Sequence, residues 1–111
     1  MRSLSNDILD QISRAVVFVA DPLMVILMGS HANGEARPDS DIDLTVIGER
    51  SKNKTWSRRR MVGNIRRALP RTDRPVDVLY FTPDEVARWG KAKNHVINHA
   101  LTEGTVIYER P

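Results

Sequence analysis

The sequence contains no cysteine and few aromatic residues: tryptophan, tyrosine and phenylalanine each occur twice in 111 residues. Without cysteine, the chain can form neither a disulfide framework nor a metal site with thiolate ligands, and a reducing compartment suits it. No aromatic residue lies among the arginines of the basic segment 58–74, which argues against a platform for stacking single-stranded bases. The composition therefore excludes cysteine chemistry and disfavours single-strand binding.

Long hydrophobic runs are also missing. The longest are Ala15–Ala20 and Leu23–Met28, far shorter than the roughly 20 residues that span a bilayer. The first seven residues lack the apolar core of a signal peptide. We therefore expect a cytoplasmic protein. A chain of this length can bury one core but hardly two, so residues 1–111 are expected to form a single domain.

The spacing of apolar residues predicts alternating helices and strands. Apolar residues of the segment 5–19 fall on one stripe of a helix, and Thr82–Glu85 has the pattern of a capping box. We expect helices at 5–19, just after Gly29, at 55–69 and at 83–102 with an interruption near Gly90, and strands at 23–28, 43–47, 75–81 and 105–109. Elements in this order predict the α/β (α+β) class, with a small mixed β-sheet flanked by helices.

Two aspartates lie at the start of one predicted strand. Ten residues separate Ser30 from Asp41, and Asp41-Ile42-Asp43 opens the apolar run that ends at residue 47. Alternate residues of a strand share one face, so Asp41 and Asp43 project together while Ile42 and Leu44 face the other way. Adjacent carboxylates repel each other and resist ionising unless a cation lies between them. Mg²⁺ suits such a site because it takes oxygen ligands and keeps phosphate oxygens in its shell.

The Gly29-Ser30 pair supplies a complementary feature. It ends the apolar run Leu23–Met28 abruptly. Glycine lets the backbone approach a ligand closely, and a helix that begins just after it offers free N–H groups to an anion. The two segments together predict a phosphate group held beside a metal ion.

The Gly-Ser pair, the ten-residue spacing and the Asp-x-Asp pair resemble the signature of the DNA polymerase β-like nucleotidyltransferase superfamily and, within it, the minimal nucleotidyltransferase (MNT) group. The resemblance implies the polymerase β-like fold and a single minimal nucleotidyltransferase domain over residues 1–111. It also implies that Asp41, Asp43 and a third aspartate, Asp77 of the strand 75–81, are catalytic and hold two Mg²⁺ ions. By the same resemblance, Gly29 and Ser30 bind the nucleotide, which is expected to be ATP.

Two further positions bear on this resemblance. Aspartate is disfavoured in mid-strand, and Asp77 is expected to share a face with Leu79 and Phe81, so packing alone does not account for it. The family often has arginine where this chain has Asn33. Contact with the triphosphate is then left to Arg37 or to the more distant arginines.

Membership of the MNT group would imply a partner, a HEPN-family ribonuclease toxin. The MNT protein acts as antitoxin by transferring AMP from ATP to a tyrosine hydroxyl of the toxin, with release of pyrophosphate. Larger relatives carry an extra helical domain for a small-molecule acceptor, and we expect no room for one after Asp77. Two alternatives stay open: a nucleotidyltransferase whose small-molecule or RNA acceptor comes with another subunit, and a non-catalytic antitoxin that neutralises its partner by binding.

Seven arginines crowd into residues 58–74. Successive helical residues are about 100° apart, so the arginines cannot all face one ligand. They form either a solvated face or a surface for an acidic partner, with direct nucleic-acid binding the weakest option. His95 and His99 have a spacing that can bind zinc, but no third ligand accompanies them, so we expect an ordinary helix face. Trp56 and Trp89 are expected to fill the edges of the core.

Overall fold

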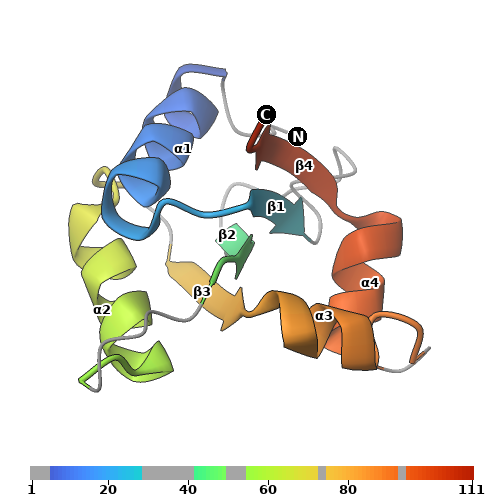
Figure 1. The fold of residues 1–111 in the computed structure, drawn as a ribbon. Helices are drawn as coiled ribbons and strands as arrows, with labels where there is room; N and C mark the ends of the chain where they lie inside the picture. Colours follow the sequence, from blue (N-terminus) through green and yellow to red (C-terminus); the bar gives the residue numbers. More distant parts are fainter. Residues whose placement is uncertain (1–5, 29–41, 50–54, 73–74, 93–94) are drawn as a thin grey trace.

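The computed structural model describes residues 6–28, 42–49, 55–72, 75–92 and 95–111 (Figure 1). Within these ranges, no helix is both long enough and apolar enough to cross a membrane. The helix expected just after Gly29 lies outside them. In chain order the elements are α1 (Asn6–Ala20), β1 (Met24–Met28), β2 (Ile42–Ile47), α2 (Arg58–Ala68), β3 (Val76–Phe81), α3 (Pro83–Trp89), α4 (Val96–Glu103) and β4 (Thr105–Glu109).

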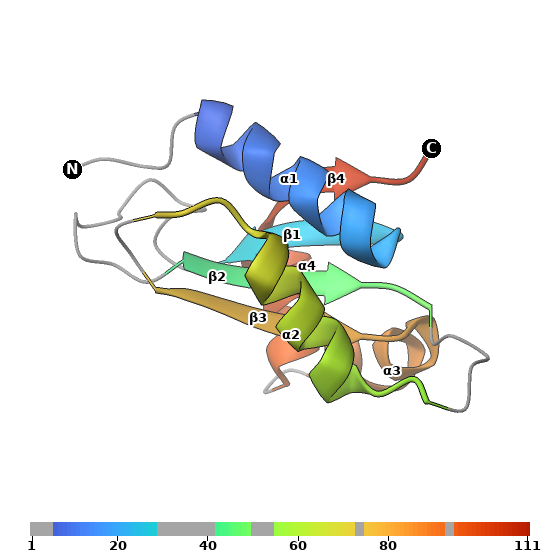
Figure 2. The same ribbon diagram turned by 90° about the vertical axis from the view of Figure 1, so that its left-hand side faces the viewer.

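The four strands form one mixed sheet in the order β3-β2-β1-β4. β1 pairs antiparallel with β2 and with β4, whereas β2 and β3 run parallel. Parallel neighbours need a long crossover connection, and α2 provides it. α1 and α2 cover one face of the sheet, and α3 and α4 lie on the other side (Figure 1 and Figure 2). The predicted α/β class with a small mixed sheet is confirmed.

The larger hydrophobic core lies between the sheet and the helices α1 and α2. Ile42, Leu44 and Val46 occupy alternate positions of β2 and are at most 1% exposed, because their side chains point into this core. Ile65 is the buried residue of α2 and packs against the same cluster. α1 contributes the apolar stripe that the sequence predicts. The alternate residues of the strands and the apolar stripes of the helices thus pack against each other in one core.

The helix ends follow their sequence signals. Thr82 accepts a hydrogen bond from the Glu85 backbone, and the Glu85 carboxylate accepts one from the Thr82 N–H, which completes the predicted capping box. The helical segment predicted over 83–102 is interrupted as expected: Gly90 caps the end of α3, and His95 caps the start of α4. Gly104 ends α4 where the chain passes against β1, and a Cβ there would collide with Ile26.

The two tryptophans differ in their surroundings. Trp56 packs against the larger core and lies 6.0 Å from the ring of Tyr80, centroid to centroid, as the sequence predicts. Trp89 is 42% exposed. It stacks on the imidazole of His95 at 5.2 Å with the rings 11° apart. Trp89 therefore holds the junction of α3 and α4 together rather than filling a core edge.

Replacing Ile65 by alanine tests whether the crossover helix is held by this one buried side chain. Ile65 is fully buried, so Ile65→Ala should lower the free energy of unfolding by about 2–5 kcal/mol through lost burial and a cavity. Denaturant unfolding followed by circular dichroism measures the change. Leu101→Ala removes an aliphatic side chain that is 43% exposed and should cost much less. Equal losses in the two variants would contradict this account.

The contact between α2 and α3 should make the free energy of unfolding decrease as the pH is lowered. Partial burial by itself would raise the pKa of Glu85, but hydrogen bonds from Thr82 and the charge of Arg58 outweigh it, so the pKa lies below its ordinary value of 4.5. A lowered carboxyl pKa stabilises the fold above the unfolded-state pKa, and the gain is lost as the pH falls through the folded-state pKa. Thermal unfolding between pH 6 and pH 3 should therefore show a smaller pH-dependent loss in Glu85→Gln than in the wild type.

Candidate active site

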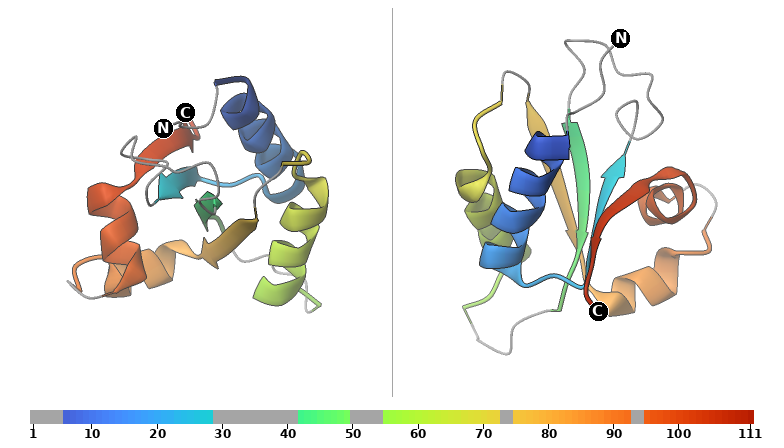
Figure 3. Two further views of the ribbon diagram at one scale, coloured as in Figure 1. Left: turned by 180° about the vertical axis from the view of Figure 1, so that it is seen from behind. Right: turned by 90° about the horizontal axis from the view of Figure 1, so that it is seen from above.

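Two aspartates lie side by side at one end of the sheet. Asp43 of β2 and Asp77 of β3 are direct partners in the parallel ladder. Registered neighbours on adjacent strands share a face, and such strands are about 4.8 Å apart. Met28, the last residue of β1, pairs with Asp43 from the other side. The aspartates therefore lie where β1 ends and where β2 and β3 begin (Figure 3).

Strand alternation puts the carboxylates on the face opposite the larger core. Val78 and Tyr80 of β3 are buried in that core, while Leu79 is 41% exposed and Asp77 is exposed with it. In β2, Leu44 belongs to the same core and its neighbour Asp43 is half-buried. The face predicted for Asp43 and Asp77 from the sequence pattern is confirmed.

A hollow of about 450 Å³ contains both carboxylates. Its polar groups are Asp43, Asp77 and the guanidinium of Arg66, and its apolar wall includes Leu79 of β3 and Val96 of α4. Three strands and two helices therefore contribute to it. A pair of acidic groups against apolar walls, with one cation at the edge, can hold a charged ligand whose oxygens complete the coordination of a metal ion.

Arg66 is the site residue that sequence reasoning did not single out. Its Nη2 lies 3.5 Å from Oδ1 of Asp77, and the side chains are 53% and 59% exposed. An ion pair at that distance and exposure contributes at most about 1 kcal/mol, so Arg66 can leave Asp77 for another anion at little cost. The available signal was topological: a helix that connects two parallel strands ends near the start of the second strand.

The other predicted site residues, Asp41, Gly29 and Ser30, lie outside the described residues, so their roles stay predictions. Their neighbours in the sequence are placed: Met28 precedes Gly29, and Ile42 follows Asp41. Met28 and Ile42 border the same end of the sheet, since Met28 is the ladder partner of Asp43. The two described residues that flank the segment 29–41 in the sequence therefore both lie beside the described carboxylates.

The donor set fits a hard divalent cation. Carboxylate oxygens are the ligands that Mg²⁺ prefers, and Asp43 and Asp77 are close enough on neighbouring strands to share one ion. Among the described residues, no cluster of three or more histidine, cysteine, aspartate or glutamate side chains forms. Asp43 and Asp77 would thus supply two ligands of the predicted metal site, to which Asp41 would add a third carboxylate.

His95 and His99 have structural roles. His95 accepts a hydrogen bond on Nδ1 from the backbone N–H of Ile97, 3.1 Å away, and so caps α4. His99 Nδ1 lies 3.3 Å from Oε2 of Glu103 on the next turn of the helix. Neither imidazole belongs to a metal-binding cluster in the part of the chain that the structure describes. The prediction of an ordinary helix face holds for His99, which is exposed on α4, whereas His95 precedes the helix as its N-cap.

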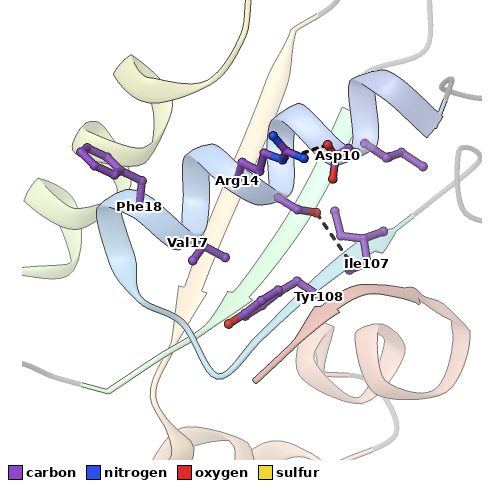
Figure 4. A pocket seen from close by; sticks show the side chains of 8 residues that line it. Asp10, Arg14, Val17, Phe18, Ile107 and Tyr108 are labelled. Atoms are coloured by element: carbon purple, nitrogen blue, oxygen red, sulfur yellow. Dashed lines mark hydrogen bonds and ion pairs between the residues drawn. The ribbon is translucent and has the colours of Figure 1, made fainter. Parts of the chain in front are cut away.

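A larger hollow of about 700 Å³ lies between α1 and β4 (Figure 4). Its lining is mainly apolar and includes Val17, Ile107 and Tyr108. Its carboxylate, Asp10, is already paired with Arg14 at 2.9 Å. Size alone would favour this hollow, but it lacks the adjacent carboxylates that metal or phosphate chemistry requires. The smaller hollow at Asp43 and Asp77 is therefore the candidate active site.

Removing either carboxylate should weaken metal binding strongly while leaving the fold intact. We expect Asp43→Asn and Asp77→Asn each to weaken Mn²⁺ binding at least about tenfold in titration calorimetry, because each removes an anionic ligand. Circular dichroism should stay unchanged, since neither aspartate belongs to the core. Asp7→Asn, in the first turn of α1, is the matched control. Wild-type Mn²⁺ affinity in both site variants would rule out this metal site.

Comparison with known proteins agrees with the geometry. A crystal structure of a candidate nucleotidyltransferase from Sulfolobus solfataricus has the same fold, with a TM-score of 0.60 at 18% identity over 94% of this chain and 79% of that chain. No curated protein matches significantly. The model of the nucleotidyltransferase domain family matches residues 9–102, and such domains generally use a nucleoside triphosphate and a divalent metal. The chain belongs to the nucleotidyltransferase domain family.

Proposed function

We propose that this nucleotidyltransferase is the antitoxin of a toxin–antitoxin pair and transfers AMP from ATP to a tyrosine hydroxyl of its partner, a HEPN-family ribonuclease toxin. Family membership supports nucleotidyl transfer in general. The observation that carries the proposal is the registered pair of Asp43 and Asp77 on adjacent parallel strands. This pair brings two carboxylates together at the end of the sheet where the predicted nucleotide-binding residues Gly29 and Ser30 follow β1.

The proposed transfer is a single displacement at phosphorus. The tyrosine oxygen forms a bond to the α-phosphorus of ATP, the bond from that phosphorus to the bridging oxygen breaks, and pyrophosphate leaves. Asp41, Asp43 and Asp77 would hold two divalent metal ions, which when bound would stabilise the negative charge on the attacking and leaving oxygens. The hydroxyl would lose its proton to water at the metal site that Asp77 completes, and Gly29 and Ser30 would hold the departing phosphates.

The exposure of the site supports an acceptor from another protein. The Asp77 side chain is 59% exposed, and it lines the hollow of about 450 Å³ near the start of β3, at one end of the sheet (Figure 3). A protruding loop can therefore bring a hydroxyl group to the carboxylates. A tyrosine has an ordinary pKa of about 10, and a nearby metal ion lowers the pKa of a hydroxyl group that it contacts.

The consequence for the partner follows from charge. AMP attached to a tyrosine adds a bulky group that carries a negative phosphodiester. A ribonuclease must bind the phosphates of RNA, so such an anion near its active site repels the substrate and obstructs the site. Transfer of AMP would thus neutralise the toxin covalently, and the effect would outlast the complex of the two proteins.

Mass spectrometry of the partner tests the proposal. Incubation of a co-encoded HEPN-family protein with the chain, ATP and Mg²⁺ should add one AMP mass per transfer, located on tyrosine by fragmentation. Asp41→Ala/Asp43→Ala should abolish the addition, while Asp7→Asn, which does not line the hollow at Asp43 and Asp77, should retain it.

The other outcomes separate the remaining functions. If the partner stays unmodified but its ribonuclease activity is suppressed, the chain is a non-catalytic antitoxin that acts by binding. If the partner is neither modified nor inhibited, while radiolabelled ATP transfers its AMP to an RNA end or a small molecule, the antitoxin assignment is wrong and the acceptor belongs to that class.

A further inference from the structure

A second hollow adjoins the candidate active site on the outer side of β3. It has a volume of about 580 Å³ and lies between the end of α2 and the start of β3, two segments that run side by side in Figure 2. Asp77 and Arg66 line both this hollow and the active site. The two concavities are therefore continuous at Asp77. We call the second one the arginine groove, because Arg66, Arg67 and Arg71 line it.

The arginine groove carries an excess of positive charge. Three arginines and one acidic residue, Asp77, line it, and Arg66 contacts the Asp77 carboxylate at 3.5 Å. Arg67 donates to the side-chain oxygen of Asn64, a neutral partner. Among the described residues, no carboxylate forms an ion pair with Arg67 or Arg71.

Some arginines elsewhere in the structure are paired. Arg14 pairs with Asp10 at 2.9 Å, and Arg58 pairs with Glu85 at 2.6 Å. Arg59, Arg60 and Arg88 resemble Arg67 and Arg71, because none of them forms an ion pair within the described residues. What distinguishes the groove is that its two such arginines lie beside Asp77, where their charge attracts anions over about one Debye length, roughly 8–10 Å in physiological salt.

The order of the strands determines on which side of the Asp43–Asp77 pair the groove lies. β2 lies between β1 and β3. The predicted phosphate-binding residues Gly29 and Ser30 follow β1 in the chain, whereas the arginine groove lies beyond β3. The end of β1, at Met28, and the groove are thus on opposite sides of the Asp43–Asp77 pair. An in-line displacement needs the attacking hydroxyl opposite the leaving group, so the proposed assignment of the leaving phosphates to Gly29 and Ser30 would put the groove on the acceptor side.

The lining of the groove favours a polypeptide over a nucleic acid. Pro70, Pro75 and Val76 provide apolar surface between the arginines, which suits aliphatic side chains and an extended backbone. No aromatic side chain lines the groove among the described residues, so bases would find no stacking partner there. Carboxylates of aspartate and glutamate accept paired hydrogen bonds from guanidinium groups. We propose that the arginine groove binds an acidic polypeptide segment that flanks the acceptor hydroxyl and delivers it to Asp77, an inference that rests on the proposed function for the identity of the acceptor.

Binding of a defined probe tests the groove without any catalysis. The probe is a fluorescent peptide with one tyrosine between glutamates, measured by anisotropy in the absence of ATP and metal. Arg67→Gln/Arg71→Gln should weaken its binding at least about tenfold, and added salt should weaken the wild type toward the level of the variant. Arg66 is left unchanged because it contacts Asp77. The matched control, Arg59→Gln/Arg60→Gln, removes two exposed charges at the opposite end of α2 and should bind like the wild type.

Two matched probes complete the experiment. The same peptide with glutamine in place of glutamate should bind weakly to every variant, and a single-stranded RNA of equal net charge should bind less tightly than the acidic peptide. Equal peptide binding by the wild type and Arg67→Gln/Arg71→Gln overturns the proposal, and so does tighter binding of the RNA that depends on the same arginines. Since no nucleotide is present, these results stand whether or not AMP transfer to a tyrosine is observed.

Discussion

Parallel pairing of β2 with β3 is the interaction on which the candidate site depends. It fixes Asp43 and Asp77 as ladder partners, and a slip of one residue would turn one carboxylate into the larger core. Buried side chains on the opposite face hold the register, because Leu44 and Val78 occupy the adjoining ladder position within the core. The hydrophobic core on one face thus determines the position of the acidic pair on the other.

The crossover helix α2 contributes both a buried apolar side chain to the core and charged side chains to two ion pairs. α2 is anchored by Ile65, which is fully buried, and the next residue in the chain is Arg66, which contacts Asp77. At the other end of the helix, Arg58 is joined to Glu85 of the capping box. One helix therefore braces α3 with its first residue and supplies a cation to the acidic pair near its last turn. The basic segment has at least two roles, and neither is nucleic-acid binding.

The sequence was sufficient wherever local patterns determine structure. Alternation along residues 75–81 correctly assigned the faces of Asp77 and Tyr80, and the capping box and the ends of the helices followed from their residue types. Arg66 could not be singled out, because its contact depends on how α2 packs across the sheet and not on its neighbours in the sequence. The exposed stack of Trp89 on His95 was missed for the same reason, since it joins two helices whose relative angle no local pattern specifies.

The weak ion pair between Arg66 and Asp77 has a consequence for how the protein folds. Two carboxylates held side by side would oppose the closure of the sheet if nothing offset their charge. A guanidinium within 3.5 Å of one of them provides that offset from within the chain. Part of the repulsion within the acidic pair is therefore offset by a side chain of the protein itself, supplied by the helix that also connects the two strands.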